Sequence, residues 1–117
     1  MLRPALIALS LSLSAATAAS AETSGITTRD AFWSLVEGRA LTRLGVTLTL
    51  TPDGAISGRV LGRKVSGRWE WKGPHFCRDF MGEGLLGYDC QTVEQRGDAL
   101  RFTAMKGTGD TLDLRLR

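Results

Sequence analysis

The residues with the clearest potential for chemistry are two cysteines and the single histidine, which lie in one short stretch of the sequence. Cys77 and Cys90 are thirteen positions apart, and His75 precedes Cys77 by two. In an oxidising compartment two cysteines at this spacing favour a disulfide, and closing a loop of about 14 residues contributes about 3 kcal/mol of stability in the chain-entropy model. The alternative is a metal site, but structural zinc takes four ligands and only three candidates lie here. We therefore predict a Cys77–Cys90 disulfide, with no metal and no other cofactor.

Catalytic groups are harder to assemble from this sequence. An oxidised Cys77 is no nucleophile, no nucleophile elbow surrounds a serine, and the C-x-x-C-H motif of haem attachment is absent. Asp79 and Asp89 could approach each other if their strands pair beside the disulfide, which would permit acid–base catalysis. The simpler interpretation is that they are partners of Arg78 or lie at the ends of turns. We predict no catalytic residue, and keep a small hydrolase or redox enzyme centred on His75 as the third hypothesis.

The first 21 residues have the three-part layout of a secretory signal peptide. A short basic start (1–4) precedes an apolar run (5–16), and Ala19-Ser20-Ala21 is a small-x-small cleavage signal before Glu22. No later segment approaches the roughly 20 apolar residues of a membrane-spanning helix. We expect a periplasmic or secreted protein in which residues 22–117 form one small domain.

Charge is spread along the chain. There are 15 lysines and arginines against 12 acidic residues, a formal net charge of +3, and no run of five or six like charges. Nucleic-acid binding and anionic-membrane binding therefore have no strong electrostatic footprint in the sequence. We predict a monomer whose partner is a periplasmic protein or a small anionic ligand, with no nucleic acid and no membrane span.

One short amphipathic helix is expected before the first strand. The spacing predicts it over about 28–37, with Thr27 as its cap and Gly38 as its stop. Phe32 begins its apolar face. Residues 22–26 are polar, and we expect a flexible leader there.

After Gly45 the hydrophobic period changes to two, which indicates half-buried strands. Turn signals such as Pro52-Asp53-Gly54 and the glycine-rich loop 82–87 separate these strands. The fold class predicted is mainly β, with the short helix followed by an antiparallel meander of about seven strands, forming a small barrel or a sandwich. The expected strands are about 46–51, 55–61, 64–72, 76–80, 88–94, 100–104 and 112–116.

A pattern of short motifs supports this interpretation. Gly67-Arg68-Trp69 gives G-x-W, the two cysteines follow, and Gly97-Asp98 forms a late turn. Together with the helix that ends in a glycine and the Thr-rich strand before an Asp-Gly turn, the pattern resembles a family of small secreted proteobacterial domains of uncharacterised function. The resemblance covers about residues 32–115. It implies a compact β-rich fold with one disulfide and implies no activity.

Sequences of this kind can carry the label dihydrodipicolinate reductase, which the residues do not support. Such an enzyme needs G-x-G-x-x-G between a buried parallel strand and a helix, and a second domain for its substrate. The glycine clusters Gly82-Glu83-Gly84 and Gly107-Thr108-Gly109 follow no such strand and open no helix. Residues 22–117 also leave no room for two domains.

Two tryptophans and several arginines are the candidate binding residues. Trp69 and Trp71 share one face of their strand, either as core or as the wall of a ligand cavity. If the last hairpin has a five-residue loop, 106–110, Arg101 faces Arg115, a destabilising pair unless a carboxylate or a bound anion lies between them. Asp113, diagonal to Arg101, is the simpler partner.

We formulate three hypotheses of function. The first is a non-catalytic periplasmic binding or accessory domain that presents a Trp/Arg surface to a protein or an anionic ligand, and the second is a small-ligand carrier with a barrel cavity bordered by Trp69, Trp71 and Phe102. The third is the enzyme already named. The predicted surface extends to the outward face of the neighbouring hairpin and comprises Trp69, Trp71, Arg59, Arg68, Arg101, Arg115 and His75.

Overall fold

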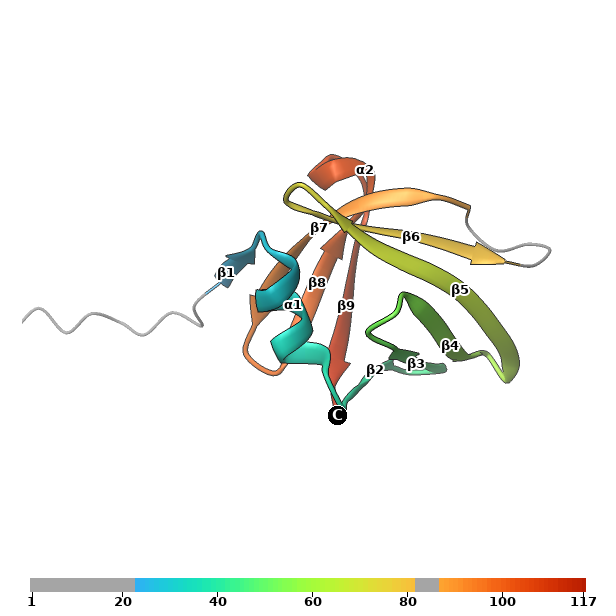
Figure 1. Ribbon diagram of the computed structural model, residues 1–117. Helices are drawn as coiled ribbons and strands as arrows, with labels where there is room; N and C mark the ends of the chain where they lie inside the picture. The colour runs from blue at the N-terminus through green and yellow to red at the C-terminus, as the bar shows by residue number, and fades with distance from the viewer. Residues whose placement is uncertain (1–22, 82–86) are drawn as a thin grey trace, which may run out of the picture.

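A computed structural model describes residues 23–81 and 87–117 of the protein (Figure 1). The predicted signal peptide, 1–21, and most of the predicted glycine-rich loop, 82–86, lie outside the described residues. The described elements are β1 (Thr23–Ile26), α1 (Arg29–Val36), β2 (Ala40–Arg43), β3 (Val46–Leu50), β4 (Ala55–Val60), β5 (Arg63–Lys72), β6 (His75–Met81), β7 (Asp89–Arg96), β8 (Ala99–Thr103), α2 (Ala104–Gly107) and β9 (Thr111–Leu116).

Strands β2 to β9 form a closed antiparallel barrel. The sheet order is β1-β7-β6-β5-β4-β3-β2-β9-β8, and pairing of β7 with β8 closes the ring. β1 is an extra strand that pairs with β7 beyond the end of β6. The predicted antiparallel, mainly β fold is confirmed, and of the two architectures expected the barrel is correct.

Two strands were missing from the predicted seven. Residues 22–26 were expected to be a flexible leader, but Thr23–Ile26 form β1, where Ile26 is buried and pairs with Val93 of β7. The prediction failed because β1 is held by backbone hydrogen bonds to β7. Such hydrogen bonds do not require a hydrophobic pattern in the sequence of the strand. β2 is only four residues long, which is too short for a clear period-two signal.

Alternation along the strands sets the inside of the barrel. In β5, Val65, Gly67 and Trp69 are buried while the residues between them are exposed, so one face of the strand is the core face. A Cβ atom on Gly67 would lie 2.5 Å from the carbonyl oxygen of Asp79, and one on Gly58 would lie 1.9 Å from that of Thr47. These two positions therefore require glycine, because the neighbouring backbone approaches too closely for a side chain.

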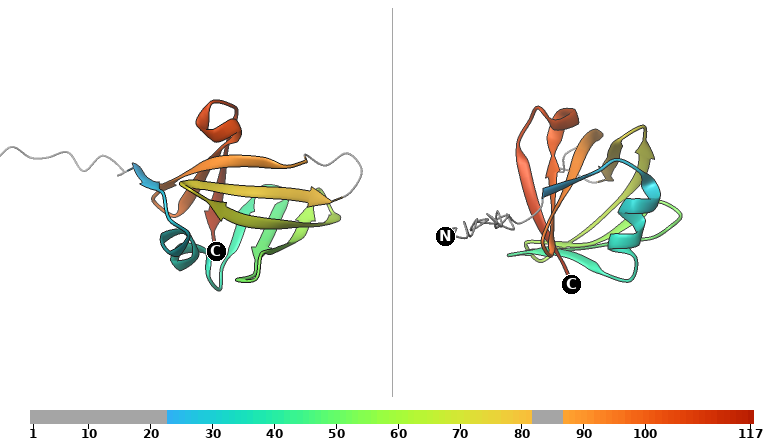
Figure 2. Two further views of the ribbon diagram at one scale, coloured as in Figure 1. Left: turned by 45° about the horizontal axis from the view of Figure 1, so that its top comes forward. Right: turned by 90° about the vertical axis from the view of Figure 1, so that its left-hand side faces the viewer.

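Helix α1 packs against one end of the barrel, which we call the closed end (Figures 1 and 2). The turns at 51–54, 73–74 and 97–98 lie at this end. Phe32 of α1 is fully buried, with its ring centroid 5.0 Å from that of Phe76 and 5.6 Å from that of Trp69. The cap is Thr28 and not Thr27, because Thr28 has extended backbone angles and its hydroxyl accepts a hydrogen bond from the Ala31 N–H.

The opposite end of the barrel, which we call the open end, carries the β2–β3 turn, the β4–β5 turn, the last residues of β6, the first of β7 and the α2 turn. Figure 1 shows the β4–β5 turn on the side of the barrel away from α1. The predicted hairpin after β8 has a longer loop than expected. Thr103 pairs with Thr111, and the loop spans 104–110 because Ala104 and Asp110 close it with a backbone hydrogen bond.

Candidate functional site

A cavity of about 540 Å³ occupies the barrel interior between the inward side chains of β2, β3, β4 and β6 to β9. Its lining is mostly apolar, as with Leu48, Ile56 and Phe102. It also touches Thr111 and Leu112, which are exposed at the open end. The cavity therefore reaches the surface at the open end, while α1 packs against the other.

Arg78 is the charged residue buried in the cavity wall. It lies between Phe76 and Phe80 in the alternation of β6 and is paired with Trp69 of β5, so its side chain shares the core face of the sheet. Its exposed fraction is 7%. A guanidinium in such a place loses hydration that surrounding groups must replace.

The guanidinium of Arg78 has few partners among the described residues. Nη1 donates a hydrogen bond to the carbonyl oxygen of Gly87, and the guanidinium carbon lies 5.5 Å from the ring centroid of Phe80. Burial lowers the pKa of Arg78, and the negative charges of Asp89 and Asp79 oppose that shift. Arg78 nevertheless stays protonated, because a guanidinium does not lose its proton in proteins at physiological pH.

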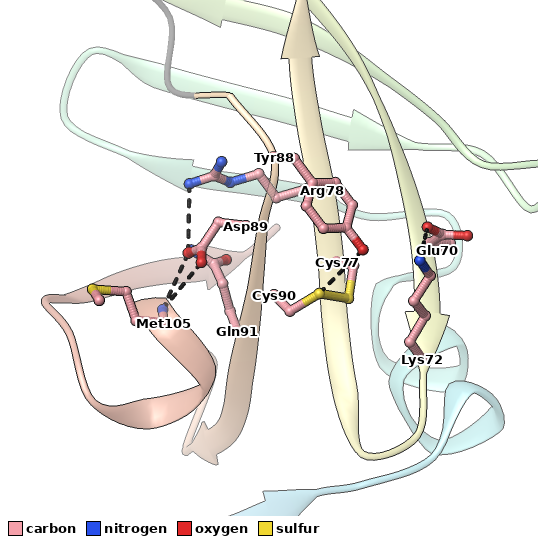
Figure 3. The surroundings of a disulfide bond; sticks show 9 residues. All are labelled: Glu70, Lys72, Cys77, Arg78, Tyr88, Asp89, Cys90, Gln91 and Met105. Carbon is pink, nitrogen blue, oxygen red and sulfur yellow. Dashed lines mark hydrogen bonds and ion pairs between the residues drawn. A yellow bond between two sulfur atoms is a disulfide. The ribbon is translucent and has the colours of Figure 1, made fainter.

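Asp89 lies directly opposite Arg78 in the β6–β7 ladder (Figure 3). Its Oδ2 is 3.9 Å from Nη2 of Arg78, which is an ion pair but too long for a direct hydrogen bond. The same carboxylate accepts hydrogen bonds from the backbone N–H of Met105 at 3.2 Å and from Nε2 of Gln91 at 3.4 Å. Asp89 therefore fastens the α2 turn to β7 and neutralises Arg78 only in part.

The disulfide holds this pair of strands together from outside the barrel. Cys77 and Cys90 are bonded and lie opposite each other, one position along the ladder from Arg78 and Asp89. β6 and β7 pair over only three positions, so the disulfide is a large part of what fixes this wall. The predicted disulfide is confirmed, and with both sulfurs joined the alternative metal site is ruled out. Within residues 23–81 and 87–117, no three metal-ligating side chains come together.

The acid–base arrangement considered for Asp79 and Asp89 does not form. Asp89 shares the cavity face with Arg78, whereas Asp79 is next to Arg78 in β6 and therefore points to the outer face. The simpler expectation, that a carboxylate would be the partner of Arg78, holds for Asp89. His75 begins β6 at the closed end, away from the cavity lining.

The two tryptophans belong to the packing around α1. Trp69 is 4% exposed, stacks on Trp33 at 6.0 Å between centroids, and donates from Nε1 to the carbonyl oxygen of Thr51. Trp71 is half-buried against Phe32 at 5.2 Å. Neither tryptophan lines the cavity, although Phe102, the third residue expected at its border, does.

The predicted facing pair of arginines does not form. Arg101 is opposite Asp113, and Arg115 is opposite Ala99, because the loop after β8 is two residues longer than predicted. Nε and Nη2 of Arg101 donate to the two carboxylate oxygens of Asp113 at 2.7 and 3.0 Å. This hydrogen bonding lowers the pKa of Asp113 and raises the pKa of Arg101.

The four arginines of the predicted surface are not gathered on one face. Arg59 and Arg68 are on β4 and β5, whereas Arg101 and Arg115 are on β8 and β9, across the barrel in the strand order. Each is also close to a local oxygen. Arg59 donates to the Gly62 carbonyl, Arg68 to the Asp53 carbonyl, and Arg115 lies 3.9 Å from Asp98.

A barrel cavity and a carboxylate partner for Arg78 were both among the expectations from the sequence, but the position of this ion pair in the cavity wall was not. The signal that could have found it is the alternation Phe76, Arg78, Phe80, which places an arginine on the apolar face of its strand. Comparison with protein-family models, with curated proteins and with solved structures finds no match for this chain. In the described part of the chain no helix is both long and apolar enough to cross a membrane. The disulfide fits an oxidising, extracytoplasmic compartment.

Proposed function

We propose that this protein is a non-catalytic carrier that holds a small molecule with an apolar body and an acidic group inside its barrel. One observation carries the proposal, namely an apolar cavity of about 540 Å³ with Arg78 buried in its wall. Ligand sites in proteins are typically about 300–1,000 Å³, mostly apolar, with a few polar groups that orient the ligand. The cavity has that size and that composition.

The apolar part of the cavity favours a hydrocarbon body. Leucine, isoleucine and phenylalanine side chains from at least five strands face the cavity. Burying an apolar ligand against them would stabilise the complex by about 25 cal/mol for each Å² of apolar surface removed from water. A ligand in the cavity would also gain dispersion contacts with these side chains.

The acidic group of the ligand follows from Arg78. Its guanidinium carries five N–H donors, and the described residues take one of them, at the carbonyl of Gly87. Asp89 lies beyond hydrogen-bond distance and is already bound to Met105 and Gln91. A carboxylate in the cavity could accept two parallel hydrogen bonds from Arg78, a geometry that guanidinium favours.

The other two hypotheses stay predictions. A Trp/Arg surface would need its residues to act from separate parts of the molecule, since Trp69 is buried and the arginines lie on opposite sides of the barrel. An enzyme centred on His75 would need a site away from the cavity. The cavity hypothesis explains more of the described geometry than either.

Binding of decanoate and of decanol to the disulfide-bonded protein, measured by calorimetry, tests the carrier hypothesis. The two probes share the same chain, but only decanoate is charged at neutral pH. We expect both to bind saturably with one site, and decanoate to bind about tenfold tighter or more, since a hydrogen bond to a charged group contributes about 1.5–3 kcal/mol.

Two variants locate the site. Leu48→Trp fills the cavity and should weaken both probes by about tenfold or more, whereas Ala31→Trp adds the same side chain on the exposed surface of α1 and should change neither. Arg78→Gln should weaken decanoate alone, and Arg96→Gln, which breaks an exposed ion pair of the same 3.9 Å length, is its control. Absence of saturable binding, or unchanged binding in Leu48→Trp, would refute the carrier function.

A further inference from the structure

The open end of the barrel carries nearly all of the exposed large apolar side chains in the described chain. Six are exposed, and the sixth, Tyr88, has its hydroxyl oxygen 3.3 Å from Cys90 Sγ, so its ring lies along the outer face by the disulfide (Figure 3). The other five stand on the β2–β3 turn, the β4–β5 turn, the end of β6, the α2 turn and the start of β9. They are Leu44 (98% exposed), Leu61 (81%), Met81 (56%), Met105 (66%) and Leu112 (38%).

Two of these side chains are presented by an unfavourable backbone. Leu61 has φ of 50° and Met105 has φ of 53°, in the left-handed region where glycine and asparagine are the usual residues. Leu61 is strained and largely exposed, and the tip of its side chain lies beside Gly45 of the β2–β3 turn, outside the core. Exposed apolar side chains at two positions with positive φ indicate that these side chains contact another molecule.

The charges around these side chains are mostly positive. Among the described residues near the open end, the exposed cations are Arg43, Arg59, Arg63, Lys64 and Lys106, against the exposed acids Asp79, Asp110 and Asp113. At the closed end exposed acids and cations are mixed, for example Asp30 with Arg29 and Glu37 with Arg39. The molecule therefore has one apolar and basic end and one end of mixed charge.

We propose that the open end docks on the surface of an anionic lipid bilayer. The five apolar side chains would enter the headgroup region, and the cations around them would lie near lipid phosphates, which is the combination by which peripheral proteins bind membranes. The side chains project from separate turns, which suits a deformable lipid surface better than a rigid protein partner. Docking of this kind would also face the mouth of the cavity toward the bilayer, but it does not depend on the carrier function.

Cosedimentation with vesicles of equal parts phosphatidylglycerol and phosphatidylcholine tests the docking. The protein should bind these vesicles, and should bind vesicles of phosphatidylcholine alone about tenfold more weakly or less. The double variant Leu61→Asn with Met105→Asn removes two apolar contacts and places asparagine where the backbone favours it. Its binding should fall about tenfold or more while its melting temperature is kept or raised.

A second set of variants removes two positive charges from either the open end or the closed end. Arg63→Gln with Lys64→Gln should weaken binding to the anionic vesicles, whereas Arg39→Gln with Arg117→Gln, at the closed end, should not. Equal loss in both would indicate non-specific attraction and overturn the proposal. Absence of vesicle binding by the unaltered protein would also overturn the proposal. So would a result in which the unaltered protein self-associates and binds no vesicles, and the asparagine variant does not self-associate. Loss of decanol binding in the earlier experiment would leave this result unaffected.

Discussion

Arg78 owes its position to the geometry of a single strand. Side chains alternate along β6, so Arg78 lies on the same inward face as Phe76 and Phe80. The pairing of β6 with β7 places Asp89 opposite Arg78. The pair is separated by 3.9 Å, and Asp89 is also bound to the Met105 N–H. A buried cation without a direct hydrogen bond to its carboxylate is costly for folding, and under the proposed carrier function a ligand carboxylate would supply such hydrogen bonds.

The residue level also shows which side chains a sequence can predict. The disulfide between Cys77 and Cys90 could be predicted, because a chain with two cysteines allows only one intramolecular pairing. Asp113 was expected as the simpler partner of Arg101, and the structure confirms this pair. The register was predicted wrongly, because register in a hairpin depends on the loop, and a loop two residues longer places Asp113 instead of Arg115 opposite Arg101.

The Arg101–Asp113 pair predicts a small pH dependence of stability. The pKa of Asp113 is lowered in the folded state by its hydrogen bonds to Arg101, so the pair stabilises the fold above the unfolded pKa, near 4. This stability should be lost as the pH falls through the lower, folded pKa. Urea unfolding from pH 6 down to about pH 2 should show the loss in the unaltered protein, and Asp113→Asn should lack that component. An identical pH profile in the two proteins would contradict the assignment.

At the level of elements, the β6–β7 ladder depends on its disulfide. Only three residue pairs join the two strands, and Cys77 and Cys90 form the middle one. We expect Cys77→Ala with Cys90→Ala to lower the free energy of unfolding by about 3 kcal/mol, the chain-entropy value for a loop of this length. Urea unfolding under identical conditions measures it. A loss below about 1 kcal/mol would mean that the strands are held mainly by other contacts.

Helix α1 is the second element on which the barrel depends. Phe32 is fully buried among Trp69, Phe76 and Phe102, so Phe32→Ala should cost about 3–5 kcal/mol of unfolding free energy. Leu35→Ala, on the same helix but only half-buried, should cost clearly less. Equal losses, measured by thermal and urea unfolding, would show that helix formation and not packing of Phe32 is what matters.

The elements that the sequence predicted well are those with a long periodic pattern. β3, β4 and β5 were expected within one residue of their bounds, because alternation and turn residues agree there. β1 and the α2 turn were missed for the opposite reason. β1 has four residues and is held by pairing with β7, and α2 contains two residues with positive φ that are neither glycine nor asparagine.

At the level of the whole molecule, the two ends of the barrel differ in what they expose. The cations of the open end come from three separate segments, 43, 59–64 and 106, so they form no run in the sequence. This is why charge patterning in the sequence did not indicate a basic end, which appears only in the assembled barrel. The lining of the cavity was predicted incompletely for a similar reason, since it comes from seven strands, and of the three residues expected at its border only Phe102 lines it.

Ring closure has a further consequence for this protein. The final strand, β9, bridges β2 and β8, and Arg117 exchanges two backbone hydrogen bonds with Ala40. Until that last segment has arrived, both neighbours present unpaired strand edges, which are templates for aggregation. A nascent or truncated chain that lacks β9 therefore has two unpaired strand edges that can pair with another molecule, and β9 covers both edges within the same molecule.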